Sequence, residues 1–184
     1  TLIGLNLRDR IKIGASGKII TAFDIARTMA LGADWGNAAR GFMFALGCIQ
    51  AQACHTGKCP TGVTTQDTSR QRSLVVPDKA ERVANFHRNS LVALAELISA
   101  AGLTHPDQLR PAHLIRRVSS TEICSAAELY EFLGPGELLY GTPKAQLFAR
   151  YWHQVSSESF ALKARESRQP RSQMLEPVVE TIDL

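Results

Sequence analysis

Three cysteines within twelve residues constrain this chain more than any other feature of its sequence. Cys48, Cys54 and Cys59 follow the spacing Cys-x5-Cys-x4-Cys, and Cys124 lies 65 residues further on. Thiolates are the usual ligands of iron–sulfur clusters, and three that share one cluster must point into the same small space. We therefore expect the chain to leave any helix near Cys48 and to fold back. Glycine and proline within the same segment allow a turn and prevent further helix.

Other uses of these cysteines stay open. They could be buried as small apolar side chains, form a disulfide with one thiol left over, or bind zinc together with His55. The flanking Gly, Thr, Lys and Pro residues are not typical of a core, and the adjacent Cys54 and His55 rarely both face one ion. Three local ligands and a distant fourth cysteine favour a cluster that lacks one iron corner. We expect Cys124 to be structural, and His55 and Lys58 to offer positive charge or hydrogen-bond donors to sulfur.

Composition limits the class of protein. The 184 residues are 45% hydrophobic and 21% charged, with a net charge of +4, which is ordinary for a globular protein and excludes a disordered, collagen-like or disulfide-dense chain. No apolar run reaches the roughly 18 residues of a membrane helix. We expect no membrane and no nucleic-acid partner. Because no secretory leader is visible, we expect a reducing, cytoplasmic location.

The first 52 residues have the pattern of a parallel α/β sheet, in which strands and helices alternate. Thr21 and Asp24 form a capping box that opens the first helix, and Gly32 stands where a helix ends. The expected elements are a strand at 10–13 leading into a tight loop at 14–17, a helix from 21, a strand at 33–38 and a helix at 41–52.

The second half reads as mostly helical. Capping boxes at Asp78/Glu81, Thr104/Asp107 and Ser125/Glu128 each predict a helix, the first of them long and ending near Gly102, and Thr142-Pro143 predicts a last one. The chain then divides into residues 1–66 with the cysteine segment, a helical extension at 67–155, and a mobile tail at 156–184.

Two stretches carry a resemblance to a known family. Residues 41–48 read Gly-Phe-Met-Phe-Ala-Leu-Gly-Cys, and residues 54–66 read Cys-His-Thr-Gly-Lys-Cys-Pro-Thr-Gly-Val-Thr-Thr-Gln. Together they resemble the FMN-binding domain of the glutamate synthase family, in which a helix closing the flavin barrel leads into a Cys-x5-Cys-x4-Cys segment that binds a 3Fe-4S cluster. The resemblance is close over residues 7–66 and looser up to about residue 119, through the helix at 83–89.

The resemblance implies a fold and a set of site residues. The two strand–helix units would be the last two of a (β/α)8 TIM barrel, followed by the cysteine loop and a mostly helical extension. Loops after the last two strands of such barrels commonly bind phosphate. By this resemblance the metal ligands would be Cys48, Cys54 and Cys59, and the FMN phosphate would lie against Ser16, Gly17, Lys18, Ala39, Arg40 and Gly41.

It also implies an activity. In the intact oxidoreductase, electrons from a ferredoxin or a reductase subunit would pass through the cluster to FMN. Reduced FMN would then convert 2-iminoglutarate, derived from 2-oxoglutarate, to L-glutamate, as in glutamate biosynthesis. The remaining barrel strands would come from the same or another chain, so we expect the 184 residues alone to be inactive. Two alternatives stay open: another FMN- or phosphate-binding barrel, and a non-enzymatic zinc- or nucleic-acid-binding module that uses Arg110, Arg116 and Arg117.

Overall fold

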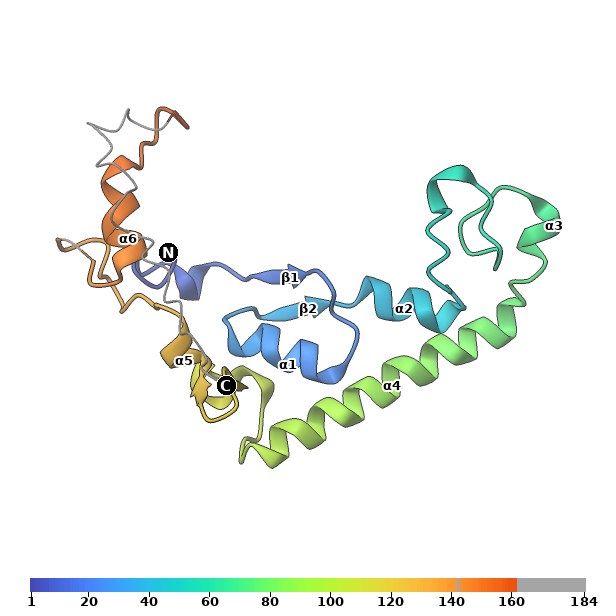
Figure 1. Cartoon of the computed structure of the whole chain (residues 1–184), viewed down its shortest axis with the longest axis horizontal. Helices are drawn as coiled ribbons and strands as arrows, with labels where there is room; N and C mark the ends of the chain where they lie inside the picture. The colour runs from blue at the N-terminus through green and yellow to red at the C-terminus, as the bar shows by residue number, and fades with distance from the viewer. Residues whose placement is uncertain (142, 162–184) are drawn as a thin grey trace, which may run out of the picture.

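The computed structural model describes residues 1–141 and 143–161. Thr142, where the last helix is expected to begin, and residues 162–184 of the expected tail lie outside the described residues. Figure 1 shows an elongated molecule in which the long helix α4 (Val76–Ala100) runs beside the first strand–helix units. The cysteine segment lies at one end of α4.

A short parallel sheet comes first. Strands β1 (Gly14–Ser16) and β2 (Trp35–Asn37) pair in parallel, with Gly14 opposite Trp35 and Ser16 opposite Asn37. The predicted order of strand, helix, strand and helix is confirmed. The bounds predicted for the first strand are wrong: residues 11–13 have no regular structure after a 3-10 turn at Arg8–Arg10, and the strand occupies Gly14–Ser16, within the expected loop.

Helix α1 (Ala22–Ala30) joins the two strands. Its predicted capping box is confirmed: the Thr21 hydroxyl accepts from the Asp24 N–H, and the Asp24 carboxylate accepts from the Thr21 N–H. The buried face consists of small side chains, so the helix packs closely against α4. The core between the two helices contains Ala22, Ala26, Ala30, Leu94, Ile98 and Leu109.

Helix α2 (Ala39–Leu46) is shorter than predicted. Gly47 follows it with a φ of +108°, and the Cys48 N–H donates to the Met43 carbonyl at 3.0 Å, a glycine-based helix end. Ile49, expected on the apolar face of this helix, lies beyond it and is 66% exposed. The cysteine segment therefore starts as a loop immediately after Gly47.

Helix α4 starts without a side-chain cap. The predicted Asp78/Glu81 capping box is wrong, because the cap position is Val75 and Asp78 lies inside the first turn. Pro77 accounts for the start, since proline fits the first turn of a helix, where its missing N–H has no partner to lose. Toward its middle, α4 meets α2 through the Phe42 and Phe86 rings, whose centroids are 5.2 Å apart.

The second half is less helical than predicted. Strands β3 (Ile115–Arg117) and β4 (Ile123–Ser125) form an antiparallel hairpin within the expected helical extension, and Ser125 and Glu128 cap α5 (Ala126–Leu129) as predicted. The expected Thr104/Asp107 box is replaced by one in which His105 is the cap and Gln108 closes it. The remaining elements are α3 (Thr68–Gln71), α6 (Gln146–Tyr151) and 3-10 turns at Cys54–Thr56, Pro106–Gln108, Pro111–His113 and Trp152–Gln154.

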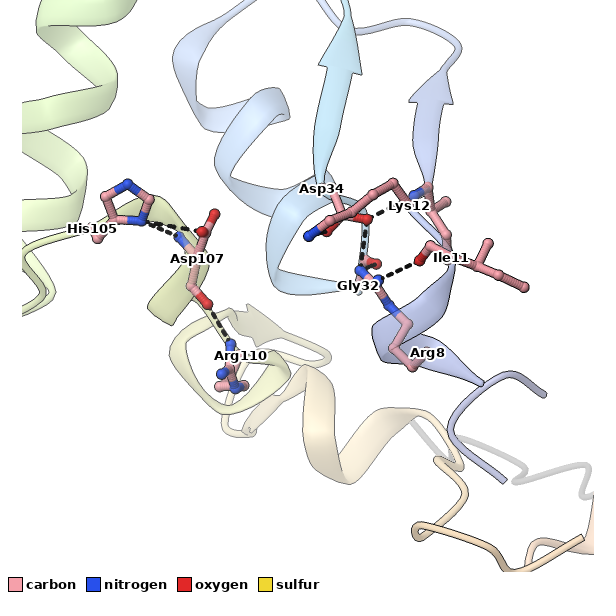
Figure 2. A network of polar contacts seen from close by, with 9 residues as sticks. Arg8, Ile11, Lys12, Gly32, Asp34, His105, Asp107 and Arg110 are labelled. Carbon is pink, nitrogen blue, oxygen red and sulfur yellow. Dashed lines mark hydrogen bonds and ion pairs between the residues drawn. The ribbon is translucent and has the colours of Figure 1, made fainter. Parts of the chain in front are cut away.

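Charged side chains tie the segment before β1 to the segment before β2 (Figure 2). The Asp34 carboxylate accepts from the Ile13 N–H at 2.6 Å, from Arg8 at 2.9 Å and from Lys12 at 3.3 Å. The backbone hydrogen bond from Ile13 contributes most to a lowered pKa of Asp34. This network fixes the amino ends of the two strands, at the far end of the sheet from the loops that the sequence singles out.

The first residues of the chain pack with a later segment in a second, smaller core. Leu133, Leu138 and Ala145 are buried there, and the Leu138 N–H donates to the Gly4 carbonyl at 2.9 Å. The N-terminal segment is thus joined to residues more than 130 positions later in the sequence. Over the described part of the chain, no helix combines the length and apolarity needed to cross a membrane.

Candidate functional site

A cavity of about 590 Å³ opens where β1 and β2 end. The loops after both strands, the middle of α2 and the start of the cysteine segment all contribute to its wall. Its lining consists of Ser16, Gly17, Lys18, Ile19, Asn37, Ala39, Arg40, Met43, Phe44, Cys48, Gln50, Gln52 and Cys54. Five of the six residues expected to hold the FMN phosphate and two of the three cysteines expected to bind metal therefore line one cavity.

Two successive residues in the loop after β1 have positive φ values. Gly17 has a φ of +116°, and Lys18 follows with a φ of +54°. A Cβ on Gly17 would meet no atom within 4 Å, so this glycine is required by its backbone conformation and not by packing. The exposed Lys18 side chain also places a positive charge in this loop.

The loop after β2 supplies a second cation. Asn37 ends the strand, Ala39 begins α2, and Arg40 follows in the first helical turn with an exposed side chain. The first N–H groups of a helix have no partners within it and carry partial positive charge. Lys18 and Arg40 therefore bring two cations and a helix N-terminus to the same cavity.

Gly41 does not line this cavity. It is buried on the side of α2 that faces α4, where an added Cβ would lie 2.7 Å from the Phe86 ring and 3.2 Å from the Ile20 carbonyl oxygen. The structure gives this glycine a packing role between two helices, which the sequence alone does not reveal.

The cysteine segment folds back on itself as expected. It passes through the 3-10 turn Cys54–Thr56, and Gly57 then takes a positive φ of 70°. Hydroxyl groups close the loop, because the Thr65 hydroxyl donates to the Gly57 carbonyl and the Ser73 hydroxyl donates to the Thr61 carbonyl at 2.7 Å. The loop thus holds its shape through side chain-to-backbone hydrogen bonds and the short helix α3.

The three cysteines line one small cavity without forming a disulfide. Cys48 is half-buried, Cys54 is exposed, Cys59 is buried, and all three are free thiols. They line a second, smaller cavity beside the first, whose free volume is about 10 Å³. Among the described residues, no three His, Cys, Asp or Glu side chains are close enough to hold a single metal ion. The donor type fits an iron–sulfur cluster, and the loop must open to admit one.

Cys59 has the strongest electrostatic perturbation in this segment. A hydrogen bond with the Thr61 hydroxyl, at 3.5 Å from the sulfur, and one from the Thr64 N–H lower the pKa of the Cys59 thiol to about 6. The thiolate is the form that binds metals and attacks electrophiles, and the lowered pKa of Cys59 favours this form at neutral pH. His55 and Lys58, expected to accompany the sulfurs, are exposed on the same loop.

Several residues that line the larger cavity carry no recognisable signal in the sequence. Gln50 and Gln52 both have φ values near +55°, at 56° and 54°, and both line the larger cavity. Glutamine is not a residue that marks a left-handed conformation, so no sequence signal identifies these positions. Met43 and Phe44 also contribute to the wall, although their spacing on α2 indicates only an apolar helix.

The remaining candidates lie away from the cavity. Cys124 is half-buried on β4, where burial and the neighbouring Glu122 raise the pKa of its thiol. Arg116 and Arg117, expected on a helix, lie on β3, and the Arg117 guanidinium donates to the Ser120 carbonyl. The Arg110 guanidinium donates to the Asp107 carbonyl (Figure 2). It also donates to the Leu109 carbonyl. These arginines do not gather on one helix face.

Residues 1–104 match the family model described as a conserved region in glutamate synthase. The chain is 42% identical, over 123 residues, to the glutamate synthase large subunit-like protein YerD of Bacillus subtilis, covering 67% of this chain and 23% of that protein. It is 38% identical, over 104 residues, to the archaeal glutamate synthase (NADPH) of Methanocaldococcus jannaschii, covering 56% of this chain and 20% of that protein. With ferredoxin-dependent glutamate synthase 2 of Synechocystis it shares 41% identity over 81 residues, 44% of this chain and 5% of that protein. The chain thus spans less than a quarter of the length of these relatives.

Proposed function

Because this chain belongs to the glutamate synthase family, we propose that it is the segment of a glutamate-synthase-like oxidoreductase that binds the FMN phosphate and a 3Fe-4S cluster. One observation carries this proposal. The loops after β1 and β2 and the cysteines Cys48 and Cys54 line the same cavity of about 590 Å³. A flavin phosphate and a cluster bound by these residues would be neighbours, as electron transfer between two cofactors requires.

The phosphate end of the cavity is built from backbone and cations. Gly17 and Lys18 present their N–H groups in a turn of positive φ, and Ala39 begins a helix. Arg40 would hold phosphate oxygens with its planar guanidinium, and Lys18 would contribute a point charge. The Ser16 hydroxyl and the Asn37 amide can complete the hydrogen bonds.

The cluster end would use Cys48, Cys54 and Cys59 as ligands. All three are free and line one small cavity, and Cys59 is already biased toward the thiolate. His55 and Lys58 would offset the negative charge of the sulfurs from the exposed side of the loop.

The chemistry comes from the cofactors, and the chain positions them. FMN would supply hydride transfer and the cluster one-electron transfer, so that 2-iminoglutarate is reduced to L-glutamate with electrons from a ferredoxin or a reductase subunit. The names of the relatives support such a donor, since they include a ferredoxin-dependent and an NADPH enzyme. The described residues would hold the phosphate and the sulfurs, and other residues of the intact protein would hold the substrate.

The fold proposed for the intact protein is a (β/α)8 barrel. Its last two units would be β1–α1 and β2–α2. The parallel pairing of β1 with β2 and the position of the cavity at their carboxyl ends support this assignment. The outer edges of both strands have no partner within residues 1–141 and 143–161, so further strands can pair there. Those strands would come from the same or another chain.

Cofactor analysis of the anaerobically purified intact protein tests the proposal. We expect bound FMN together with iron and acid-labile sulfide. Cys48→Ser, Cys54→Ser and Cys59→Ser should each lose the cluster, while Cys124→Ser keeps it. Arg40→Gln should weaken FMN binding about 10- to 100-fold, because a hydrogen bond to a charged group contributes roughly 1.5–3 kcal/mol. Arg10→Gln, an exposed arginine outside the cavity, is the control.

Three results would overturn the proposal. One zinc per chain without sulfide would assign the cysteines to a structural zinc site. Iron and sulfide without flavin, or a cluster retained in all three serine variants, would separate the cysteine segment from the phosphate loops.

A further inference from the structure

The turn after Cys59 places two threonine hydroxyls against the cavity that the cysteines share. Thr61 and Thr64 both line that cavity. Thr61 is held from behind, because its carbonyl accepts from the Ser73 hydroxyl at 2.7 Å. Its own hydroxyl lies 3.5 Å from the Cys59 sulfur, within hydrogen-bonding distance for a sulfur acceptor.

The environment of the Thr64 hydroxyl differs from that of the Thr61 hydroxyl. Its hydroxyl oxygen is buried and makes no well-formed hydrogen bond, the only buried side-chain nitrogen or oxygen atom in this state among the described residues, although it lies near enough to the Cys59 sulfur to help lower the pKa of that thiol. A buried hydroxyl without a partner costs about 1–3 kcal/mol, so native proteins rarely keep one. A cluster bound in the cavity would bring sulfur atoms close to the Thr64 hydroxyl, and these sulfurs could accept its hydrogen bond.

We propose that Thr61 and Thr64 are positioning residues that donate hydrogen bonds to sulfur at this site, Thr61 to the Cys59 thiolate and Thr64 to a sulfur acceptor inside the cavity. This proposal rests on the proposed function, since it assumes that the cavity opens to hold a cluster. The turn packs closely on α3, because Gly62, between the two threonines, has a φ of +77° and a Cβ there would lie 2.3 Å from the Arg70 carbonyl oxygen. Both threonines therefore lie on one short turn beside Cys59.

Hydrogen bonds to sulfur have a measurable consequence. Reduction adds one negative charge to a cluster, and donors aimed at its sulfurs stabilise the more negative form. Removing a donor should therefore shift the reduction potential to a more negative value. A merely structural role in the loop would leave the potential of an assembled cluster unchanged.

Reduction potentials of the intact, cluster-containing protein test this inference. The variants are Thr61→Val and Thr64→Val, which keep the side-chain shape and remove the hydroxyl, and Thr64→Ser, which keeps the hydroxyl. Thr68→Val, an exposed threonine on α3 outside the cavity, is the matched control. Iron and acid-labile sulfide are measured for every variant, and the potential is followed by a redox titration with the electron paramagnetic resonance signal of the oxidised cluster.

We expect a more negative potential for both valine variants and the wild-type value for Thr64→Ser and Thr68→Val. Loss of the cluster in Thr64→Val alone, with a full complement of iron and sulfide in Thr64→Ser, would also support the proposed role of the Thr64 hydroxyl. Unchanged potentials in both valine variants would overturn this inference and leave the proposed function intact, as would a Thr64→Ser variant that behaves like Thr64→Val. A wild-type protein without iron and sulfide would overturn both.

Discussion

Two helices of this chain begin where a single carboxylate accepts hydrogen bonds from backbone N–H groups. Asp24 accepts from the N–H groups of Ile20 and Thr21 before α1, and Glu128 accepts from the Ser125 N–H before α5. An ionised carboxylate is the better acceptor, so these hydrogen bonds lower the pKa of both acids. Asp24 in addition pairs with Arg27 at 3.4 Å. The charge of each carboxylate therefore contributes to folding.

Asp24→Asn should reveal this contribution through its pH dependence. Because the pKa of Asp24 is lower in the folded state, its stabilisation is present above the unfolded value of about 3.9 and is lost as the pH falls through the folded value. At neutral pH we expect the variant to lose about 0.5–1 kcal/mol, typical of an acid in the first turn of a helix. Urea unfolding followed by circular dichroism should show this difference shrinking below about pH 4.

The control for this experiment is Asp9→Asn. The Asp9 carboxylate is exposed and accepts no hydrogen bond within residues 1–141 and 143–161, so this variant should unfold like the wild type at neutral pH. A difference between Asp24→Asn and wild type that stays constant into the acid range would contradict the role of the charge.

At the scale of elements, the spacing of α2 and α4 depends on a small residue. Gly41 lies where the two helices approach each other, under the Phe86 ring. The ends of these two helices differ from those that the sequence predicts. α2 ends at Gly47 before its apolar pattern ends, and α4 begins at Val76 with a proline and without the expected acidic cap.

Gly41→Ala tests whether this position serves packing. An added Cβ would lie 2.7 Å from the Phe86 ring, so the helices must move apart at a cost of about 1–3 kcal/mol. Chemical unfolding of Gly41→Ala, Phe86→Leu and the double variant measures the coupling. We expect the alanine to cost less in the Phe86→Leu background than beside the native ring. Equal costs in both backgrounds would point to a different constraint on Gly41, such as the Ile20 carbonyl oxygen 3.2 Å from the added Cβ.

The whole molecule has little interior for its length. Ile19 is the largest side chain that is almost fully buried among the described residues, and half of the six buried residues in the main core between α1 and α4 are alanines. Large apolar side chains are exposed instead, among them Phe23, Trp35, Val76 and Ile123. Together with the unpaired outer edges of β1 and β2, this exposed apolar surface of the described residues favours association with other chain segments.

We therefore expect the 184-residue chain, expressed by itself, to self-associate. Size-exclusion chromatography with light scattering should give a mass well above 20.1 kDa. Co-expression with the strands proposed to complete the barrel should suppress this association and restore flavin binding. A stable monomer carrying stoichiometric FMN would contradict both the association and the proposed barrel.

Much of this protein is determined locally. The capping boxes at Thr21/Asp24 and Ser125/Glu128 form as their sequences predict, because each needs only groups three residues apart. The cysteine spacing and its glycine likewise suffice to predict a loop that folds back. Prediction from near neighbours fails where a stretch of sequence is compatible with either a helix or a strand. The hairpin β3–β4 replaces expected helix, because its short strands are fixed by pairing with each other, which propensity does not foresee.

The cavity itself is a tertiary result. Parallel pairing of β1 with β2 brings Gly17 and Arg40 to one edge, although 23 positions separate them in the sequence. The early end of α2 then directs Cys48 and Cys54 to the same hollow, and the turn held by α3 places Thr64 beside the cysteines. The sequence by itself determined which chemical groups are available and how the loops turn, because these depend on near neighbours along the chain. Only the tertiary structure decided which groups meet, because that depends on the pairing of strands and the packing of helices far apart in sequence.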